Sequence, residues 1–327
     1  MHGAVEYQPP GYEYIGPIGK GCFGNVIKLR RIRDDTIFAC KEVSYANMST
    51  KEKELLVSEV NLLRELNNIN IVKYVDRHID KLHGKIYIIM EYCSNGDLSA
   101  YIRKHRKSRT YIAEEVIWTV LVQILLALQY CHKKDPQVLH RDLKPSNVLL
   151  TDDDTVKLAD FGLARVLKSG EIANTLVGTP LYMSPEQVNR QGYDVKSDVW
   201  SVGCMTYEMA ALHPPFDADD RESLQEKIKE GKIEPLPNHY SNSLQQMVSA
   251  MLCMSHSNRA TIDQLLETRV ANSYAVEVRN QQYKKVEIKK IEQKTEQLKR
   301  WEEKLREKEK YLNQKEAELR QQFPMYF

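Results

Sequence analysis

A block of polar residues in the middle of the chain has the composition needed to move a phosphoryl group. The run His140–Asn147 reads HRDLKPSN, and Asp160 opens the triplet DFG that follows at short range. Phosphoryl transfer needs metal ligands, positive charge on the transferred group and a carboxylate that orients the attacking hydroxyl. Asp142 is the candidate carboxylate and Lys144 the candidate neutralising charge. Asn147 and Asp160 offer the hard oxygen ligands that magnesium prefers.

A glycine-rich segment near the N-terminus can cover a phosphate. Gly19–Val26 (GKGCFGNV) matches G-x-G-x-x-G-x-V, and glycines let a hairpin lie close over phosphates with its N–H groups aimed at the anions. By itself the pattern is weak, because an ordinary glycine turn between two strands looks the same. A dinucleotide-binding fold is disfavoured, because strand-like sequence rather than a helix follows the glycines.

Lys41 ends the apolar run Phe38–Lys41 (FACK), fifteen residues after Val26. A lysine in an otherwise apolar strand should be paired or functional. The helix-like stretch that follows offers Glu59 as its carboxylate partner. Taken alone, Lys41 could equally be a surface lysine on an edge strand.

These four motifs occur together in the order that is typical of one family. From about Tyr14 to Val270 the chain resembles the eukaryotic protein kinases. The resemblance implies an α+β fold with two lobes, followed here by a long C-terminal helix, and it implies ATP and Mg²⁺ as cofactors. It also implies that Lys41 holds the α- and β-phosphates and pairs with Glu59, while Asp198 braces the catalytic loop from a buried helix.

The same resemblance assigns the nucleotide-binding residues. Met90 is expected to be the gatekeeper, and the backbone of Glu91 and Cys93 is expected to bind adenine. Glu186, in the triplet SPE that stands for A-P-E, is expected to pair with Arg259. The residues expected to line the nucleotide site are Ile18, Gly19, Gly21, Gly24, Val26, Ala39, Lys41, Met90, Glu91, Cys93 and Leu149, with Val26, Ala39 and Leu149 around the adenine ring.

Four segments of the second half resemble the NIMA-related kinases. They are Val177–Gln187 (VGTPLYMSPEQ), Lys196–Cys204 (KSDVWSVGC), Ala211–Phe216 (ALHPPF) and Ile228–Lys232 (IKEGK). The likeness is greatest to the branch that acts at centrosomes and basal bodies and carries a leucine-repeat coiled coil after the kinase domain. One departure is Asn67–Val72 (NNINIV), which lacks the usual His-Pro before Asn-Ile-Val and which we expect to affect lobe packing rather than chemistry.

The block that follows Asp142 indicates the class of acceptor. Lys144–Asn147 (KPSN) has lysine two residues after Asp142, as serine/threonine kinases do, where tyrosine kinases use arginine and alanine. By the same resemblance the hydroxyl of Thr179 bridges Asp142 and Lys144, although Thr179 could also be a plain turn residue. The predicted activity is that of a non-specific serine/threonine protein kinase, which transfers the γ-phosphate of ATP to protein hydroxyls.

Two other functions remain as alternatives. A pseudokinase scaffold would keep the fold and lose the reaction, but the reacting set is intact in Lys41, Asp142, Asn147 and Asp160. A second alternative is that the chain acts mostly as a coiled-coil assembly module, a role that is compatible with catalysis.

Thr175 is the expected site of activating phosphorylation. The loop between Asp160 and Glu186 also carries Ser169 and Thr179, but Thr175 sits where the NIMA-related kinases carry their activating threonine. In the family, Arg141 binds a phosphate on this loop. A phosphate adds about −1.5 to −2 charges and can order the loop against that arginine. An unmodified loop threonine is the alternative.

The elements that must position these residues show two patterns of secondary structure along the chain. Short β-type runs and one helix-like stretch, Lys51–Leu66, fill the chain up to about Lys85, and helical periodicity dominates from Asp97 onward, as in Glu114–Cys131. A small β-rich lobe therefore precedes a larger helical lobe. The predicted domains are a flexible leader (1–13), an N-lobe (14–92), a C-lobe (93–270) and a charged helix with a potential coiled coil (271–327).

The last segment combines dense alternating charge with one aliphatic stripe. Residues 276 to 320 contain no proline or glycine and are predicted to form one long exposed helix. The stripe recurs every seven residues, at Ile291, Leu298, Leu305, Leu312 and Leu319. A coiled coil needs a second apolar position per heptad, and that position is poor here. A solvated helix without a partner is therefore the alternative to the weak parallel homodimer through residues 288–320 that we favour.

Composition sets the remaining expectations. The 327 residues carry a formal charge of +2, so nothing in the balance requires nucleic acid or an anionic membrane as partner. Six scattered cysteines without a C-x-x-C pair favour neither a disulfide framework nor a zinc site. We therefore expect protein substrates as partners, without nucleic acid or membrane. The expected location is the cytoplasm, extending to the cytoskeleton, centrosome or basal body, and to the nucleus.

Overall fold

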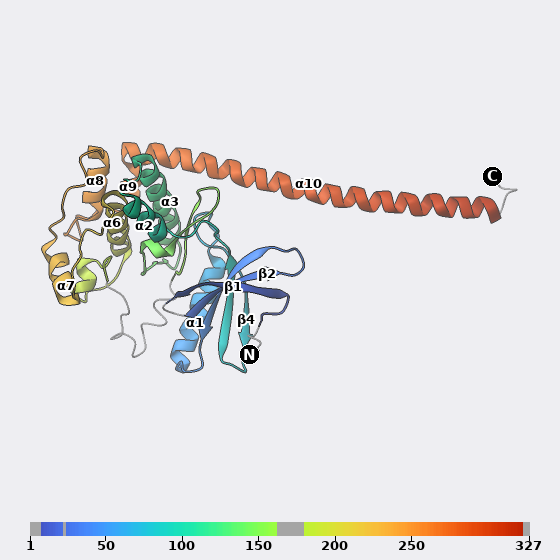
Figure 1. Ribbon diagram of the computed structural model, residues 1–327, viewed down its shortest axis with the longest axis horizontal. Coiled ribbons are helices and arrows are strands. Elements are labelled where there is room, and N and C mark those ends of the chain that lie inside the picture. Colours follow the sequence, from blue (N-terminus) through green and yellow to red (C-terminus); the bar gives the residue numbers. More distant parts are fainter. Residues whose placement is uncertain (1–7, 22–23, 162–179, 323–327) are drawn as a thin grey trace. The chain divides into compact units, whose positions relative to one another are not determined.

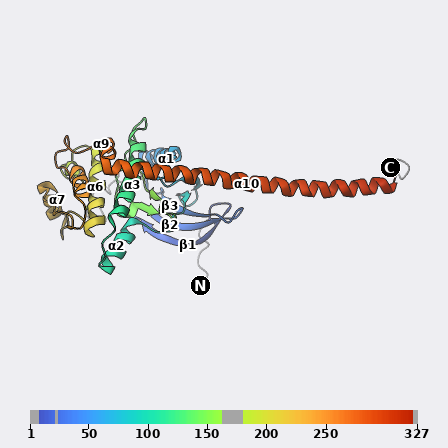
Figure 2. The same ribbon diagram turned by 90° about the horizontal axis from the view of Figure 1, so that it is seen from above.

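The protein consists of two compact units, residues Met1–Ala275 and Val276–Phe327. The computed structural model describes residues 8–21, 24–161 and 180–322. Within the first unit, a sheet-rich lobe (blue and cyan in Figure 1) precedes a helix-rich lobe (green to orange), and the same division is visible from above in Figure 2. The expected α+β fold with two lobes is confirmed.

The smaller lobe is a five-stranded antiparallel sheet. In spatial order its strands are β1 (Tyr12–Gly21), β2 (Gly24–Arg31), β3 (Ile37–Ser44), β5 (Lys85–Glu91) and β4 (Tyr74–Asp80). Its core includes the fully buried Leu29, Cys40, Tyr87 and Ile89. β1 begins two residues before the predicted lobe boundary at Tyr14, because Tyr12 is itself buried and packs edge-on against Phe38.

One helix, α1 (Thr50–Glu65), accompanies the sheet and agrees with the predicted stretch. It begins at a capping box: the Ser49 hydroxyl accepts from the backbone of Glu52, and the Glu52 carboxylate accepts from the backbone of Ser49 at 2.8 Å. Its buried residues recur at helical spacing, at Leu56, Val60 and Leu63. This helix carries Glu59 on its half-buried side.

The larger lobe is built around two buried helices, α3 (Glu114–His132) and α6 (Val195–Ala211). α3 is long and apolar enough to cross a membrane by composition, but most of it is buried in the protein, so its apolar sequence is explained by the core. On α6 every residue from Ser197 to Ala210 is buried. Around them lie α2 (Leu98–Ser108), α5 (Pro185–Val188), α7 (Arg221–Glu230), α8 (Asn242–Met251) and α9 (Ile262–Glu267).

Short elements of the larger lobe lie at the end of the catalytic block. They are the 3-10 helix η1 (Pro145–Asn147) and the hairpin of β6 (Val148–Leu150) and β7 (Val156–Leu158). Ile71 and Asp97 each form an isolated bridge to this hairpin. Asn70 is buried, and its amide donates to Gln123 Oε1 and to the Val156 carbonyl at 2.8 Å each. The unusual Asn67–Val72 segment therefore does take part in lobe packing.

The C-terminal helix α10 spans Arg269–Gln322, so the predicted long helix is confirmed and begins seven residues before position 276. Its first seven residues belong to the first unit. In the second unit the aliphatic stripe is exposed: Ile291, Leu298, Leu305, Leu312 and Leu319 keep 45–65% of their accessible surface. Three i,i+4 ion pairs form along this helix, Glu296–Arg300, Glu302–Arg306 and Glu316–Arg320.

Candidate active site

Asp142 lies at the centre of a hydrogen-bonded loop. Lys144 Nζ is 2.8 Å from Asp142 Oδ2, and the Asn147 amide donates to the same oxygen at 3.0 Å and to the Asp142 carbonyl at 2.7 Å. Pro145 opens η1 with the fixed φ that a first helical position favours. The turn brings Asn147 back onto Asp142. Three residues expected to act on the phosphoryl group are thus in mutual contact.

A single buried carboxylate anchors the backbone of this loop. Asp198, on α6, accepts from the backbone N–H groups of His140 at 3.1 Å and Arg141 at 3.2 Å. The side chains of His132 and Tyr193 hydrogen-bond to the same carboxylate. Burial alone would raise the pKa of Asp198, but the bonds from His132 and Tyr193 hold it below the ordinary value. Arg141 has a φ of 70°, a left-handed backbone that its surroundings must impose.

Lys41 reaches across to the DFG carboxylate. Its Nζ lies 2.6 Å from Asp160 Oδ1, although Lys41 is almost completely buried. Asp160 also has a left-handed φ, 62°. The buried Phe161 ring lies 4.4 Å from the ring of His140, so the DFG segment packs on the catalytic loop. The expected pairing of Lys41 with Glu59 on α1 stays a prediction.

The register of the sheet places the expected nucleotide contacts on one face. Val26 is opposite Lys41, and Ala39 is opposite Met90. Residues directly opposite in antiparallel strands share a face, as do residues two apart on one strand. Val26, Ala39, Lys41 and Met90 therefore lie on the same face. Val26 and Ala39 are half-buried there, as is Leu149 on β6.

The β1–β2 hairpin carries the glycine loop. A Cβ on Gly24, whose φ is 143°, would lie 1.8 Å from the Glu42 carbonyl oxygen, so only glycine fits. Gly21 is opposite Gly24 in the register. A Cβ on Gly19 would meet no atom within 4 Å, and Ile18 keeps 45% of its surface. The exposed Ile18 side chain therefore lies next to the unfilled space at Gly19.

Residues 12–271 match the family model for the protein kinase domain. The chain belongs to the protein kinase family. It is 50% identical over 256 residues to the probable serine/threonine-protein kinase nek2 of Dictyostelium discoideum, covering 78% of this chain and 61% of that protein. It is 42% identical over 327 residues to the mouse serine/threonine-protein kinase Nek2, covering 94% and 74%.

A third relative is the G2-specific protein kinase nimA of Emericella nidulans, 39% identical over 284 residues, covering 79% of this chain and 41% of that protein. These matches place the chain among the NIMA-related kinases, as its sequence predicts. The chain spans about three fifths of the length of the Dictyostelium relative.

Glu91 and Cys93 belong to the segment that joins the two kinase lobes, and only some of their backbone groups can hydrogen-bond to adenine. The Glu91 N–H donates to the Lys73 carbonyl at 3.0 Å, and the Glu91 carboxylate accepts from Lys157 at 2.7 Å. The Glu91 carbonyl oxygen and the backbone of Cys93 are the remaining candidates. Burial, reinforced by the Glu91 charge, raises the pKa of the Cys93 thiol to about 12, so the thiol is neutral at pH 7.

Protein kinase domains use ATP together with a divalent metal ion, and the donors present here fit a hard cation. Because the Asn147 amide nitrogen is held by Asp142, its oxygen is the atom that faces away as a ligand. The Asn147 carbonyl accepts from the Ala159 N–H at 2.9 Å, which fixes the DFG segment beside the loop. Asp160 adds carboxylate oxygen. An amide and a carboxylate oxygen are the ligands expected for Mg²⁺.

The short helix α5 is held by a buried ion pair. Glu186, on α5, pairs with Arg259 through two hydrogen bonds of 2.7 and 3.0 Å, which agrees with the sequence expectation. Burial would raise the pKa of Glu186, but the bonds from Arg259 and Ser197 lower it to about 2. Thr175 and Thr179 lie outside the described residues.

Sequence reasoning missed two residues of this site. His132 ends α3 and Tyr193 precedes α6, and both bind the carboxylate of Asp198. Neither belongs to a motif that we recognised. A histidine at the end of an otherwise apolar helix and a tyrosine five residues before a buried aspartate were the available signals.

Proposed function

We propose that this chain is a serine/threonine protein kinase that transfers the γ-phosphate of ATP to hydroxyl groups of protein substrates. The observation that carries the proposal is Asp142, whose Oδ2 lies within 3.0 Å of side-chain nitrogens of both Lys144 and Asn147. A carboxylate held in this way can accept a proton while a cation beside it neutralises the transferred group. Family membership supports the same activity.

The chain's own residues divide the work of the reaction. Asp142 orients the substrate hydroxyl and takes its proton as the new bond from oxygen to the γ-phosphorus forms. The bond from that phosphorus to the bridging oxygen breaks, and ADP leaves. Lys144 stabilises the charge on the transferred group, and Lys41 stabilises charge on the phosphates that leave.

We propose Mg²⁺ as the metal, held by the oxygens of Asn147 and Asp160. A bound Mg²⁺ supplies neutralising charge on the β- and γ-phosphates. The ion pair between Lys41 and Asp160 supports this assignment. It places the Asp160 carboxylate beside Lys41, the ammonium group that would contact the phosphates. Transfer should stop when a chelator removes the metal and return when Mg²⁺ is restored.

The direct test is transfer from ATP labelled on its γ-phosphate, with the purified chain and a mixed protein substrate. Phosphoamino-acid analysis of the product should give phosphoserine and phosphothreonine, because Lys144 stands two residues after Asp142. Label recovered mainly as phosphotyrosine would contradict the proposed acceptor class. Absence of transfer at any chain concentration would favour the pseudokinase alternative.

We also propose how the activity is controlled and located. Phosphorylation of Thr175, read by Arg141, activates the chain, and a weak homodimer through residues 288–320 brings two kinase domains together. The exposed stripe on α10 supports the dimer, since burial of five aliphatic side chains would stabilise it.

The likeness to the centrosomal branch supports a cytoplasmic location at the cytoskeleton, centrosome or basal body, with access to the nucleus. Microscopy of a tagged chain beside a centrosome marker tests this.

A further inference from the structure

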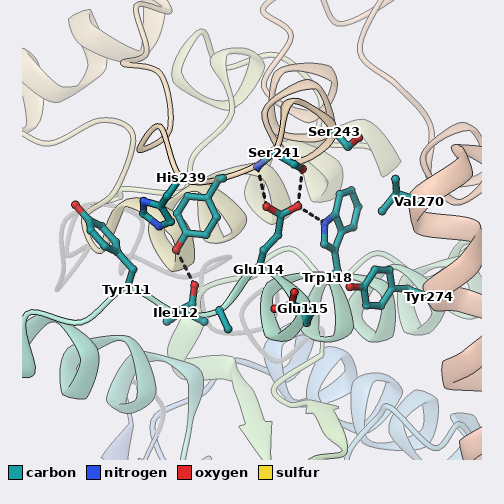
Figure 3. Close-up of a pocket in the computed structure, with 12 residues that line it drawn as sticks. Tyr111, Ile112, Glu114, Glu115, Trp118, His239, Ser241, Ser243, Val270 and Tyr274 are labelled. Carbon is teal, nitrogen blue, oxygen red and sulfur yellow. Dashed lines mark hydrogen bonds between the residues drawn. The ribbon is translucent and has the colours of Figure 1, made fainter.

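The larger lobe contains a cavity of about 650 Å³ that none of the candidate active-site residues lines. The segment before α3, the first two turns of α3, the loop before α8 with the start of α8, and the first two turns of α10 surround it. Figure 3 shows Glu114 between two aromatic groups, with Tyr111 and His239 on one side and Trp118 and Tyr274 on the other. All of these residues belong to the first unit.

The aromatic walls are fixed by their own contacts. The Tyr111 and His239 ring centroids are 4.4 Å apart, and the Trp118 and Tyr274 rings are stacked at 6.0 Å. The Tyr240 hydroxyl donates to the Ile112 carbonyl at 2.8 Å, and this bond fixes the backbone beside Tyr111 and His239. A ligand that enters between such walls needs to order few side chains, and this lowers the entropic cost of binding.

The cavity carries a negative charge on Glu114, which accepts three hydrogen bonds from neutral groups. Glu114 accepts from the Trp118 indole at 2.9 Å, from the Ser241 hydroxyl at 2.5 Å and from the Ser241 backbone at 2.7 Å. Burial would raise the pKa of Glu114, but these bonds hold it below the ordinary value, so it is ionised at pH 7. Glu115 adds an exposed carboxylate. The described lining residues include no lysine or arginine.

The hydrogen bonds that Glu114 already accepts determine which further hydrogen bond a ligand can donate to it. A carboxylate offers about four acceptor positions. Trp118 and the Ser241 hydroxyl occupy Oε1, and one backbone N–H occupies Oε2, so Oε2 can accept one further donor. The complementary group is a cation with an N–H donor and a flat face that stacks on aromatic rings.

We propose that this cavity binds an arginine side chain presented by a protein partner. The guanidinium group is planar, weakly hydrated and always charged, so it can stack on the exposed Tyr111 ring while it donates to Glu114. A lysine ammonium is a strongly hydrated point charge that stacks less well. The volume lies in the range of binding pockets and leaves room for the residues that flank the arginine. Binding here does not depend on the kinase reaction.

The test follows the indole N–H signal of Trp118 by NMR in the full chain, identified by its loss in Trp118→Phe. The probes are the peptides Gly-Gly-Arg-Gly-Gly and Gly-Gly-Lys-Gly-Gly and the peptide with neutral citrulline in place of arginine. The arginine peptide should shift the signal saturably. The citrulline and lysine peptides should bind about tenfold more weakly.

Variants of exposed wall residues then locate the site. Tyr111→Ala and Glu115→Gln should each weaken binding of the arginine peptide severalfold. Two controls, Val116→Ala on the same helix and Glu226→Gln on α7, should not. Thermal unfolding checks that all four variants are folded, and phosphorylation of a substrate peptide without arginine should be unchanged in them. Equal binding of the arginine and citrulline peptides, wild-type binding in both wall variants, or a signal that responds only to a proline-rich peptide would overturn the proposal.

Discussion

Charged side chains in the interior of the first unit lie beside partners of complementary charge or hydrogen-bonding type. Lys41 contacts Asp160, Glu186 contacts Arg259, and Asp198 collects four hydrogen bonds. Removing one partner of a pair in which both side chains are buried, such as Glu186 and Arg259, leaves a buried charge without compensation and costs several kcal/mol. Loss of Lys41 leaves Asp160, whose side chain keeps 30% of its surface exposed to water, and loss of an exposed pair costs little. The residues that matter for stability and those that matter for catalysis can therefore be separated by substitution.

Lys41→Met should remove most phosphoryl transfer and leave the fold intact. Methionine fills a similar volume in the buried strand position, while the charge that stabilises the phosphates is lost. We expect a rate loss of about 10²–10³-fold, typical for removal of one electrostatic contact to the transition state. The initial rate of label transfer from ATP measures this. Lys85→Met, a lysine on the adjacent strand that pairs with Glu42, is the control and should keep its rate; near-wild-type transfer by Lys41→Met would show that Lys41 has no such role.

Glu186→Gln should destabilise the chain in a pH-dependent way. Folding lowers the pKa of Glu186 from 4.5 to about 2, so the ionised form stabilises the fold by about 3 kcal/mol above pH 4.5. That contribution declines as the pH falls from 4.5 toward 2. Urea unfolding at pH 7 and at pH 3.5 should show a deficit for Glu186→Gln that is smaller at the lower pH. The exposed Glu226→Gln should match wild type, and a deficit independent of pH would contradict the assigned cause.

Individual side chains were predictable where a motif fixed both their type and their spacing. Asp142, Lys144 and Asn147 lie close together in the chain, so local geometry brings them into contact. His132 could not be predicted, because its contact with Asp198 arises only when α3 and α6 pack side by side. Tyr193 lies five residues before Asp198 but belongs to no motif that marks the contact. The cavity around Glu114 could not be predicted either, since Ser241, which donates two hydrogen bonds to its carboxylate, lies 127 residues away in the chain.

At the scale of elements, the site consists of short segments held by longer ones. α6 supplies Asp198 to the catalytic loop, and the sheet register sets Lys41 and the apolar nucleotide contacts on one face. Hydrophobic periodicity located α1 and α3 to within one residue at their starts. The start of β1 at Tyr12 and the start of α10 at Arg269 were set instead by packing: Tyr12 on Phe38, and Tyr274 on Trp118.

The segment between α5 and the DFG triplet carries the proposed control by Thr175. Thr175→Ala should be at least about tenfold less active, because the phosphate that would order the segment against Arg141 cannot be added. Ser169→Ala, in the same segment, is the matched control and should keep its activity. Specific activity after incubation with ATP, with the phosphorylated sites mapped by mass spectrometry, gives the comparison. Full activity of Thr175→Ala would show that phosphorylation of Thr175 does not activate the chain.

At the scale of the whole molecule, a compact kinase unit is followed by a second unit of one charged helix. The exposed aliphatic stripe of that helix is the feature that a homodimer would use. Its ion pairs are solvent-exposed and each stabilises the helix by only about 0.2–0.5 kcal/mol. Dimerisation therefore depends on burial of the stripe.

Leu305→Glu combined with Leu312→Glu should convert a micromolar dimer into a monomer, because it places charge on the stripe. Light scattering measures the mass. Autophosphorylation should slow in step, since tethering raises the effective concentration of the two kinase units. Gln293→Glu with Gln314→Glu adds the same charge on the opposite side of the helix and should leave the dimer intact. A wild-type chain that stays monomeric at high concentration would rule out both effects.

The central claim is that Asp142 acts on the substrate hydroxyl, and a single-turnover measurement of γ-phosphate transfer from ATP in Asp142→Asn tests it most directly. Asparagine keeps the size of the side chain and an oxygen for Lys144, but it cannot take the proton. The predicted result is a rate about 10²–10⁴-fold below wild type with ATP affinity preserved, while the exposed control Asp152→Asn transfers normally. A rate for Asp142→Asn within threefold of wild type (~0.7 kcal/mol of barrier) would contradict the claim.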